Sequence, residues 1–163
     1  KAAEDYVEEY QKIYGLNYTI LRYGSIYGER SDNTNGITNV IERALKTGKI
    51  IYSGTKKTYR EHIHVLDVAK ASVSILGDNF KNKHIILSGK KLIKVPDFLQ
   101  ILAKILNIKK SKITFLNKKD SIHYEKTPFS YKFKKGKKLT LKSYINFNNG
   151  LTELVNKLKN KKI

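Results

Sequence analysis

Two spacings of apolar residues alternate along this chain of 163 residues. Apolar residues at the spacing of an amphipathic helix predict helices over residues 2–14, 37–48, 65–76, 95–106 and 151–158. Short apolar runs between them predict strands at residues 17–21, 50–53, 84–87 and 112–116. Helices and strands that follow one another in this way indicate an α/β fold with a parallel sheet.

One stretch, residues 59–69, changes its spacing within a few positions. Ile63 and Val65 alternate with polar residues as in a strand, and from Val65 to Val68 the apolar residues have helical spacing. A strand is therefore expected to end, and a helix to begin, near residue 66. Arg60 lies just before this change, and ligand-binding groups gather at strand ends in α/β proteins.

The composition indicates a single domain, since a chain of this size can bury about 70% of its unfolded surface. There is no cysteine, which excludes disulfides and thiol chemistry and fits a cytoplasmic protein. No apolar run approaches the ~18 residues that a membrane span needs, so no membrane partner is expected. The chain starts at Lys1 and contains no methionine, and we expect it to be part of a longer protein.

Positive charge is concentrated in the second half of the chain. Residues 1–80 carry 11 Lys and Arg against 10 Asp and Glu, whereas residues 81–163 carry 22 lysines against 4 acidic residues. A strongly basic segment of this kind can attract nucleic acid or another anionic partner. Arginine, the usual reader of base edges, is absent from it. We expect the lysines to reflect compositional drift, with an anionic ligand as the first alternative and nucleic acid as the least favoured.

Several kinds of site find no support. A dinucleotide site needs a glycine-rich turn between a strand and a helix, and the ten glycines form neither G-x-G-x-x-G nor a Walker motif. His62 and His64 share one side of a strand, but cysteine is absent and the other histidines are remote, so no metal site is predicted. His64 is expected to be a satisfied polar group, and Asp67 to cap or salt-bridge the helix start.

Two motifs resemble the extended short-chain dehydrogenases/reductases, the NAD-dependent nucleotide-sugar epimerases and dehydratases. Residues 59–69, Y-R-E-H-I-H-V-L-D-V-A, are similar to that family's R-[DE]-x-x-H-V-x-D-x-A element, and residues 21–28, L-R-Y-G-S-I-Y-G, to its L-R-x-x-x-x-Y-G strand and loop. The resemblance implies that residues 1–163 form the C-terminal part of a Rossmann-like parallel sheet plus a small substrate-binding domain. The glycine-rich loop would lie in an N-terminal, NAD-binding half that this chain lacks.

The resemblance also assigns roles to five residues. Lys1 is similar to the lysine of the family's catalytic Y-x-x-x-K pair, which holds the nicotinamide ribose and lowers the pKa of the tyrosine. Tyr23 is expected beside the nicotinamide, and Ser25 at the substrate, where family members often carry Asn. Tyr52 is expected to stack on the nucleotide base. Arg60 is expected to bind the diphosphate bidentately, for which lysine would be a poor replacement.

Each assignment has a structural alternative. Tyr23 and Tyr52 could be core aromatics, and Lys1 an ordinary terminal lysine. Arg60 could form an ion pair with Glu61 or Asp67 instead of binding phosphate.

The implied whole enzyme binds NAD or NADP and a nucleotide-diphosphate sugar, and acts by transient hydride transfer through a keto-sugar. The present chain would supply the substrate half, partner the N-terminal half, and be inactive alone, with a homodimer as a further option. Residues 117–150, rich in lysine and aromatic residues, would form a variable substrate lid. The alternatives are a non-enzymatic basic module that binds an anionic polymer, and an inactive truncated product.

Overall fold

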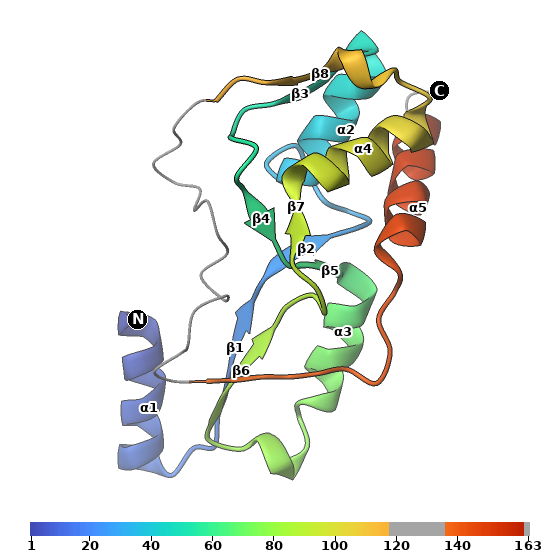
Figure 1. Ribbon diagram of the computed structural model, residues 1–163. Coiled ribbons are helices and arrows are strands. Elements are labelled where there is room, and N and C mark those ends of the chain that lie inside the picture. The colour runs from blue at the N-terminus through green and yellow to red at the C-terminus, as the bar shows by residue number, and fades with distance from the viewer. Residues whose placement is uncertain (118–135, 162–163) are drawn as a thin grey trace.

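A computed structural model describes residues 1–117 and 136–161 (Figure 1). Its α-helices are α1 (Ala2–Tyr14), α2 (Gly36–Thr47), α3 (Val65–Ser74), α4 (Val95–Leu106) and α5 (Phe147–Asn160), and short 3-10 helices cover Asp78–Phe80 and Lys110–Lys112. The strands are β1 (Thr19–Tyr23), β2 (Ser25–Tyr27), β3 (Ile50–Tyr52), β4 (Tyr59–Arg60), β5 (His62–His64), β6 (Lys83–Leu87), β7 (Ile93–Lys94), β8 (Ile113–Phe115) and β9 (Lys137–Lys138). The lid predicted over residues 117–150 falls largely outside the described residues.

Parallel pairing dominates the sheets. The largest has the order β1-β6-β9, and both of its pairs are parallel. Strand β2 pairs with β5, and β3 with β8, again in parallel, whereas β4 and β7 are antiparallel. The predicted α/β fold with a Rossmann-like parallel sheet is therefore confirmed. Strands β2, β7 and β9 were not predicted, since the residues around them carry no run of alternating or continuous apolar positions bounded by turns.

Local signals explain where the helices begin and end. The Asn35 side chain accepts hydrogen bonds from the backbone N–H groups of Ile37 and Thr38, at 3.1 and 3.3 Å, and so caps the start of α2. The same helix ends at Gly48, whose φ of 65° is the left-handed conformation that glycine adopts without strain. Helix α4 has a proline in its first turn, where the missing N–H costs nothing.

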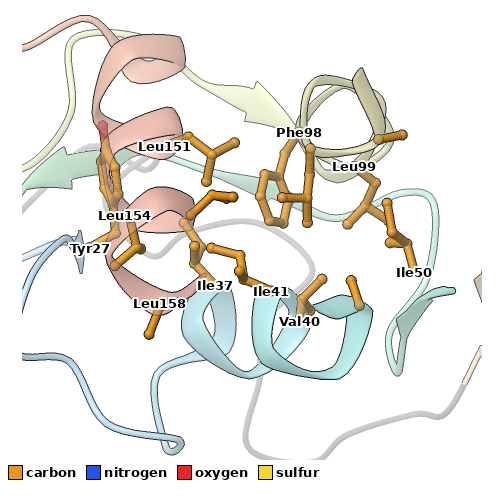
Figure 2. Packing of buried hydrophobic residues seen from close by; sticks show 14 of the residues in the cluster. Tyr27, Ile37, Val40, Ile41, Ile50, Phe98, Leu99, Leu151, Leu154 and Leu158 are labelled. Carbon is orange, nitrogen blue, oxygen red and sulfur yellow. The ribbon is translucent and has the colours of Figure 1, made fainter. Parts of the chain in front are cut away.

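Two clusters of buried apolar side chains hold the molecule together. In the larger, helices α2, α4 and α5 face one another through Ile41, Leu99 and Leu151, none of which is exposed (Figure 2). In the smaller, α3 packs on β6 through Ala71, Ile75, Ile85 and Leu87. Because each cluster serves different elements, the arrangement suits a sheet portion joined to a smaller unit, but the predicted domain division stays a prediction.

Helix α1 contacts the sheet through its polar side. Arg22 of β1 donates to Glu4, with 2.6 Å between Nε and Oε1, and His84 Nε2 of β6 lies 2.8 Å from Glu8 Oε1. The hydrogen bond from Arg22 lowers the pKa of Glu4. Large apolar side chains on the rest of the helix are exposed: Tyr6 by 70%, Tyr10 by 55% and Ile13 by 66%. The predicted helix is confirmed, but the part of the chain that the structure describes leaves its apolar face uncovered.

Candidate functional site

The β1–β6 sheet meets the β2–β5 pair at a close backbone crossing in the centre of Figure 1. The Gly24 N–H donates to the Leu87 carbonyl at 2.7 Å. A Cβ atom on Gly24 would lie 2.8 Å from the Ser88 Cβ, and one on Gly89 only 2.1 Å from the His62 carbonyl oxygen. Both positions therefore require glycine, because any side chain would push the strands apart. The crossing sets how the strand ends lie relative to one another.

Arg60 lies at the end of the short strand β4 and is half-buried. Its guanidinium Nη1 donates to the Tyr59 carbonyl at 2.8 Å. Burial lowers the pKa of Arg60, and the Tyr52 side chain acts in the opposite direction. An arginine keeps its charge through any such shift, so Arg60 supplies a fixed cation beside Tyr52. The structure thus brings together two of the residues singled out in the sequence.

The Tyr52 ring lies edge-on to the ring of Phe115, with 6.0 Å between the ring centroids and 70° between the planes. This contact follows from the parallel pairing of β3 and β8, in which Tyr52 and Phe115 are register partners. Both rings remain half-buried. A half-buried ring with a neighbouring guanidinium can stack on a planar ligand group whose charged part meets the cation.

His62 lies two residues after Arg60, and its ring sits among aromatic side chains. It is stacked on Phe147, with 5.4 Å between the ring centroids and 20° between the planes. Burial, followed by the charge on Arg60, lowers the pKa of His62 to about 4. The imidazole is therefore neutral at neutral pH and adds no charge to the site. Ser25 begins β2 directly opposite His62 in the strand register and is also half-buried.

Glu61, between Arg60 and His62, carries a carboxylate that is almost fully buried and is bound from two directions. The Ser88 hydroxyl donates to Oε2 at 2.6 Å, and the Lys138 ammonium donates to the same oxygen at 2.7 Å. Lys138 also donates to the Gly89 carbonyl at 2.9 Å. No pattern in the sequence indicated this role for Lys138, because it is one lysine among many in the basic half. The only available signal was the acidic position of the R-[DE] motif.

The other polar groups of the motif have structural roles. His64 is buried, and its Nδ1 accepts from the Leu66 N–H at 3.3 Å, which makes it the cap of α3. Asp67 accepts from the Ile145 N–H at 2.9 Å, so it anchors the segment before α5. The predicted role for His64 as a satisfied polar group is confirmed. The expectation that Asp67 caps α3 is wrong: a longer-range backbone donor takes its carboxylate.

Comparison with known proteins agrees with this geometry. A family model described as the NAD dependent epimerase/dehydratase family matches residues 1–88, more than half of the chain. The chain belongs to this family. A candidate UDP-glucose 4-epimerase of Methanocaldococcus jannaschii is 29% identical over 160 residues, which are 96% of this chain and 50% of that protein. The chain therefore spans about half the length of its relatives in the epimerase/dehydratase family.

Solved structures of the family share the fold. The UDP-glucose 4-epimerase of Thermotoga maritima, solved with UDP-glucose, is 20% identical with a TM-score of 0.79, over 99% of this chain and 52% of that one. The UDP-glucuronic acid 4-epimerase of Bacillus cereus, solved with UDP-glucuronic acid and NAD, is also 20% identical. Its TM-score is 0.78, and the match covers 97% of this chain and 50% of that one. At this identity the likeness establishes the fold and leaves residue roles open.

The structure also places the remaining residues to which the resemblance assigned roles. Lys1 stands exposed at the start of α1, where its carbonyl accepts from the Asp5 N–H at 3.0 Å. Tyr23, at the end of β1, is 42% exposed, and its hydroxyl lies 3.2 Å from the Ser72 hydroxyl of α3. The roles expected for Lys1, Tyr23 and Ser25 stay predictions.

Two further properties hold for the described residues, 1–117 and 136–161. No helix there is long and apolar enough to span a membrane. Nor do three or more His, Asp or Glu side chains gather there into a group that could hold a metal ion.

Proposed function

We propose that this chain is the substrate-binding portion of an NAD- or NADP-dependent epimerase or dehydratase that acts on a nucleotide-diphosphate sugar. The observation that carries the proposal is the half-buried Arg60 at the end of β4, within electrostatic range of Tyr52, in a chain of the epimerase/dehydratase family. The relatives solved with UDP-glucose and with UDP-glucuronic acid support the choice of a nucleotide sugar.

The proposed contacts use the geometry of the site. Arg60 binds the diphosphate, because a guanidinium presents two parallel N–H donors to phosphate oxygens. Tyr52 stacks on the nucleotide base, since its ring is half-buried and its edge is supported by Phe115. Glu61 holds the backbone beside Arg60 through Ser88 and Lys138, so the guanidinium is oriented before the ligand arrives.

The cofactor is only partly accommodated by this chain's own residues. Lys1 is exposed at the start of α1, where it can meet the nicotinamide ribose, and Tyr23 is partly exposed at the end of β1, where its ring can lie beside the nicotinamide. The sequence holds no glycine-rich turn for the pyrophosphate. When bound, the nicotinamide supplies a hydride acceptor, which allows the sugar to pass transiently through a ketone. The chain's own share is to bind and orient the sugar nucleotide.

The partner that completes the site is an N-terminal, NAD-binding half. Strand β1 has a hydrogen-bonded neighbour on one side only within the described sheet, whose order is β1-β6-β9. An edge strand leaves N–H and C=O groups free for a further strand. Helix α1 lies beside β1 (Figure 1), and its side chains Tyr6, Tyr10 and Ile13 are exposed. Burial of both would stabilise the complex, and a homodimer through the same helix is the competing arrangement.

Isothermal titration of the protein with UDP-glucose tests the proposal. Replacement of Arg60 by Ala removes a charged hydrogen-bond donor, which costs about 1.5–3 kcal/mol, or roughly a 10- to 150-fold weaker dissociation constant. Arg43→Ala is the matched control, because Arg43 is exposed on α2 and the charge change is the same. We expect the control to bind like the parent protein. Unchanged affinity of Arg60→Ala would remove Arg60 from the site.

A further inference from the structure

A groove distinct from the Arg60 site lies between helix α4, strand β8 and the loop that follows β3. These elements are neighbours in the upper part of Figure 1. The groove is open to solvent and has a volume of about 500 Å³. This volume is within the range of roughly 300–1,000 Å³ that small-molecule pockets occupy. Arg60 and Tyr52 are not among its lining residues, so it is separate from the proposed sugar-nucleotide contacts.

Among the residues that the structure describes, two lysines and no carboxylate line the groove. Lys56 comes from the loop after β3, and Lys110 from the short helix before β8, so the fold brings together cations that are far apart in sequence. Both side chains are exposed and can move toward a ligand. Two ammonium groups that border one groove attract an anion, and a phosphate has the oxygens to accept from both.

The groove also offers an aromatic surface and side-chain amides. The Lys56 ammonium lies 5.6 Å from the centroid of the Phe115 ring, which forms part of the wall. Gln100 and Asn117 line the same space and each carry one amide acceptor and two N–H donors. An aromatic face beside amides and cations suits a ligand that has a planar polar ring and a phosphate.

We propose that this groove is a second ligand site, which binds a nucleoside monophosphate independently of the Arg60 site. The phosphate lies between Lys56 and Lys110, and the base lies against Phe115 with its edge toward Gln100 and Asn117. Phe115 is the wall between the two sites, since its ring meets Tyr52 on the side of β3. The site depends on neither the cofactor nor the missing N-terminal half.

Isothermal titration with UMP in the Arg60→Ala background tests this site apart from the sugar-nucleotide site. We expect one UMP per chain, and a dissociation constant at least about tenfold weaker after Lys56→Gln and Lys110→Gln together. The matched control is Lys70→Gln with Lys159→Gln, which removes the same charge from exposed positions on α3 and α5. The control should change affinity less than about twofold, because only long-range charge is lost. If Arg60→Ala does not fold, the two double-lysine variants are compared in the parent protein, with the sugar-nucleotide site filled by saturating UDP-glucose.

Three results would overturn the proposal. Equal weakening in both double-lysine variants would show that general positive charge attracts UMP. Loss of UMP binding with Arg60→Ala alone, in a protein that remains folded, would place UMP in the sugar-nucleotide site. Binding of uridine as tight as that of UMP would exclude a phosphate contact with the two lysines. Failure of UDP-glucose to bind, with UMP binding retained, would refute the proposed function and leave the groove supported.

Discussion

Replacement of Lys138 by Met should destabilise the protein by leaving a buried carboxylate half-satisfied. In the native protein Glu61 Oε2 accepts from Lys138 at 2.7 Å and from Ser88 at 2.6 Å, and Glu61 is only 7% exposed. The substitution keeps much of the apolar stem and removes the ammonium. The Glu61 charge then has the Ser88 hydroxyl as its remaining partner in this cluster.

The size of the effect follows from the exposure of the two partners. Breaking a fully buried ion pair costs about 3–5 kcal/mol, because an uncompensated charge is left behind. The side chain of Lys138 is 32% exposed, against 10% for Glu61. Water can therefore replace part of the lost interaction, and Ser88 still donates. We expect the free energy of unfolding to fall by about 1.5–3 kcal/mol, between the value for one charged hydrogen bond and that for a buried pair.

Urea unfolding followed by circular dichroism measures this change. Lys137→Met is the matched control, because Lys137 is the exposed neighbour on the same strand, and its effect should stay within about 0.5 kcal/mol. The double variant Glu61→Gln with Lys138→Met should recover part of the loss, since the buried charge is then gone. A decrease below about 0.5 kcal/mol for Lys138→Met, or strictly additive effects in the double variant, would refute the reasoning.

Three further outcomes are expected. The chain should show no saturable binding in an NAD titration up to millimolar concentration, because it has no glycine-rich turn for the pyrophosphate. A micromolar dissociation constant for NAD would contradict its proposed role as the substrate-binding portion. The pKa of His62 is lowered to about 4 in the folded protein, so between about pH 6.5 and pH 4 the unfolded chain binds more protons than the folded one. The free energy of unfolding should therefore fall as the pH drops through this range, by roughly 3 kcal/mol at most. Acid unfolding curves measure this loss, and His62→Phe should abolish it. Leu99→Ala, at a fully buried position, should lower the free energy of unfolding by about 2–5 kcal/mol in urea titrations, and a loss near zero would mean that the core around α4 is not formed.

Helical segments could be predicted from the sequence because their signals are local. Apolar spacing and Gly48 both act within one or two turns, so helix α2 was expected close to its observed bounds. The same holds for the change from strand to helix after Arg60. The family motifs in residues 21–28 and 59–69 pointed to the family that the comparison then established.

Pairing and orientation were decided only by the tertiary structure. Strand β9 consists of two lysines, which no local rule would place in a sheet, and it forms because β6 offers a free edge to that backbone. Helix α1 was predicted as amphipathic, yet Glu4 and Glu8 bind Arg22 and His84 and turn its apolar face outward.

The candidate site shows the same division between local and long-range information. The sequence singled out Arg60 because a guanidinium at a strand end is chemically distinctive. Sequence could not show that Lys138, 77 positions after Glu61, would bind the carboxylate next to it. Nor could it show that Lys56 and Lys110 would share one groove with Phe115. Lysines are numerous here, and only the folded chain determines which of them come close to a given partner.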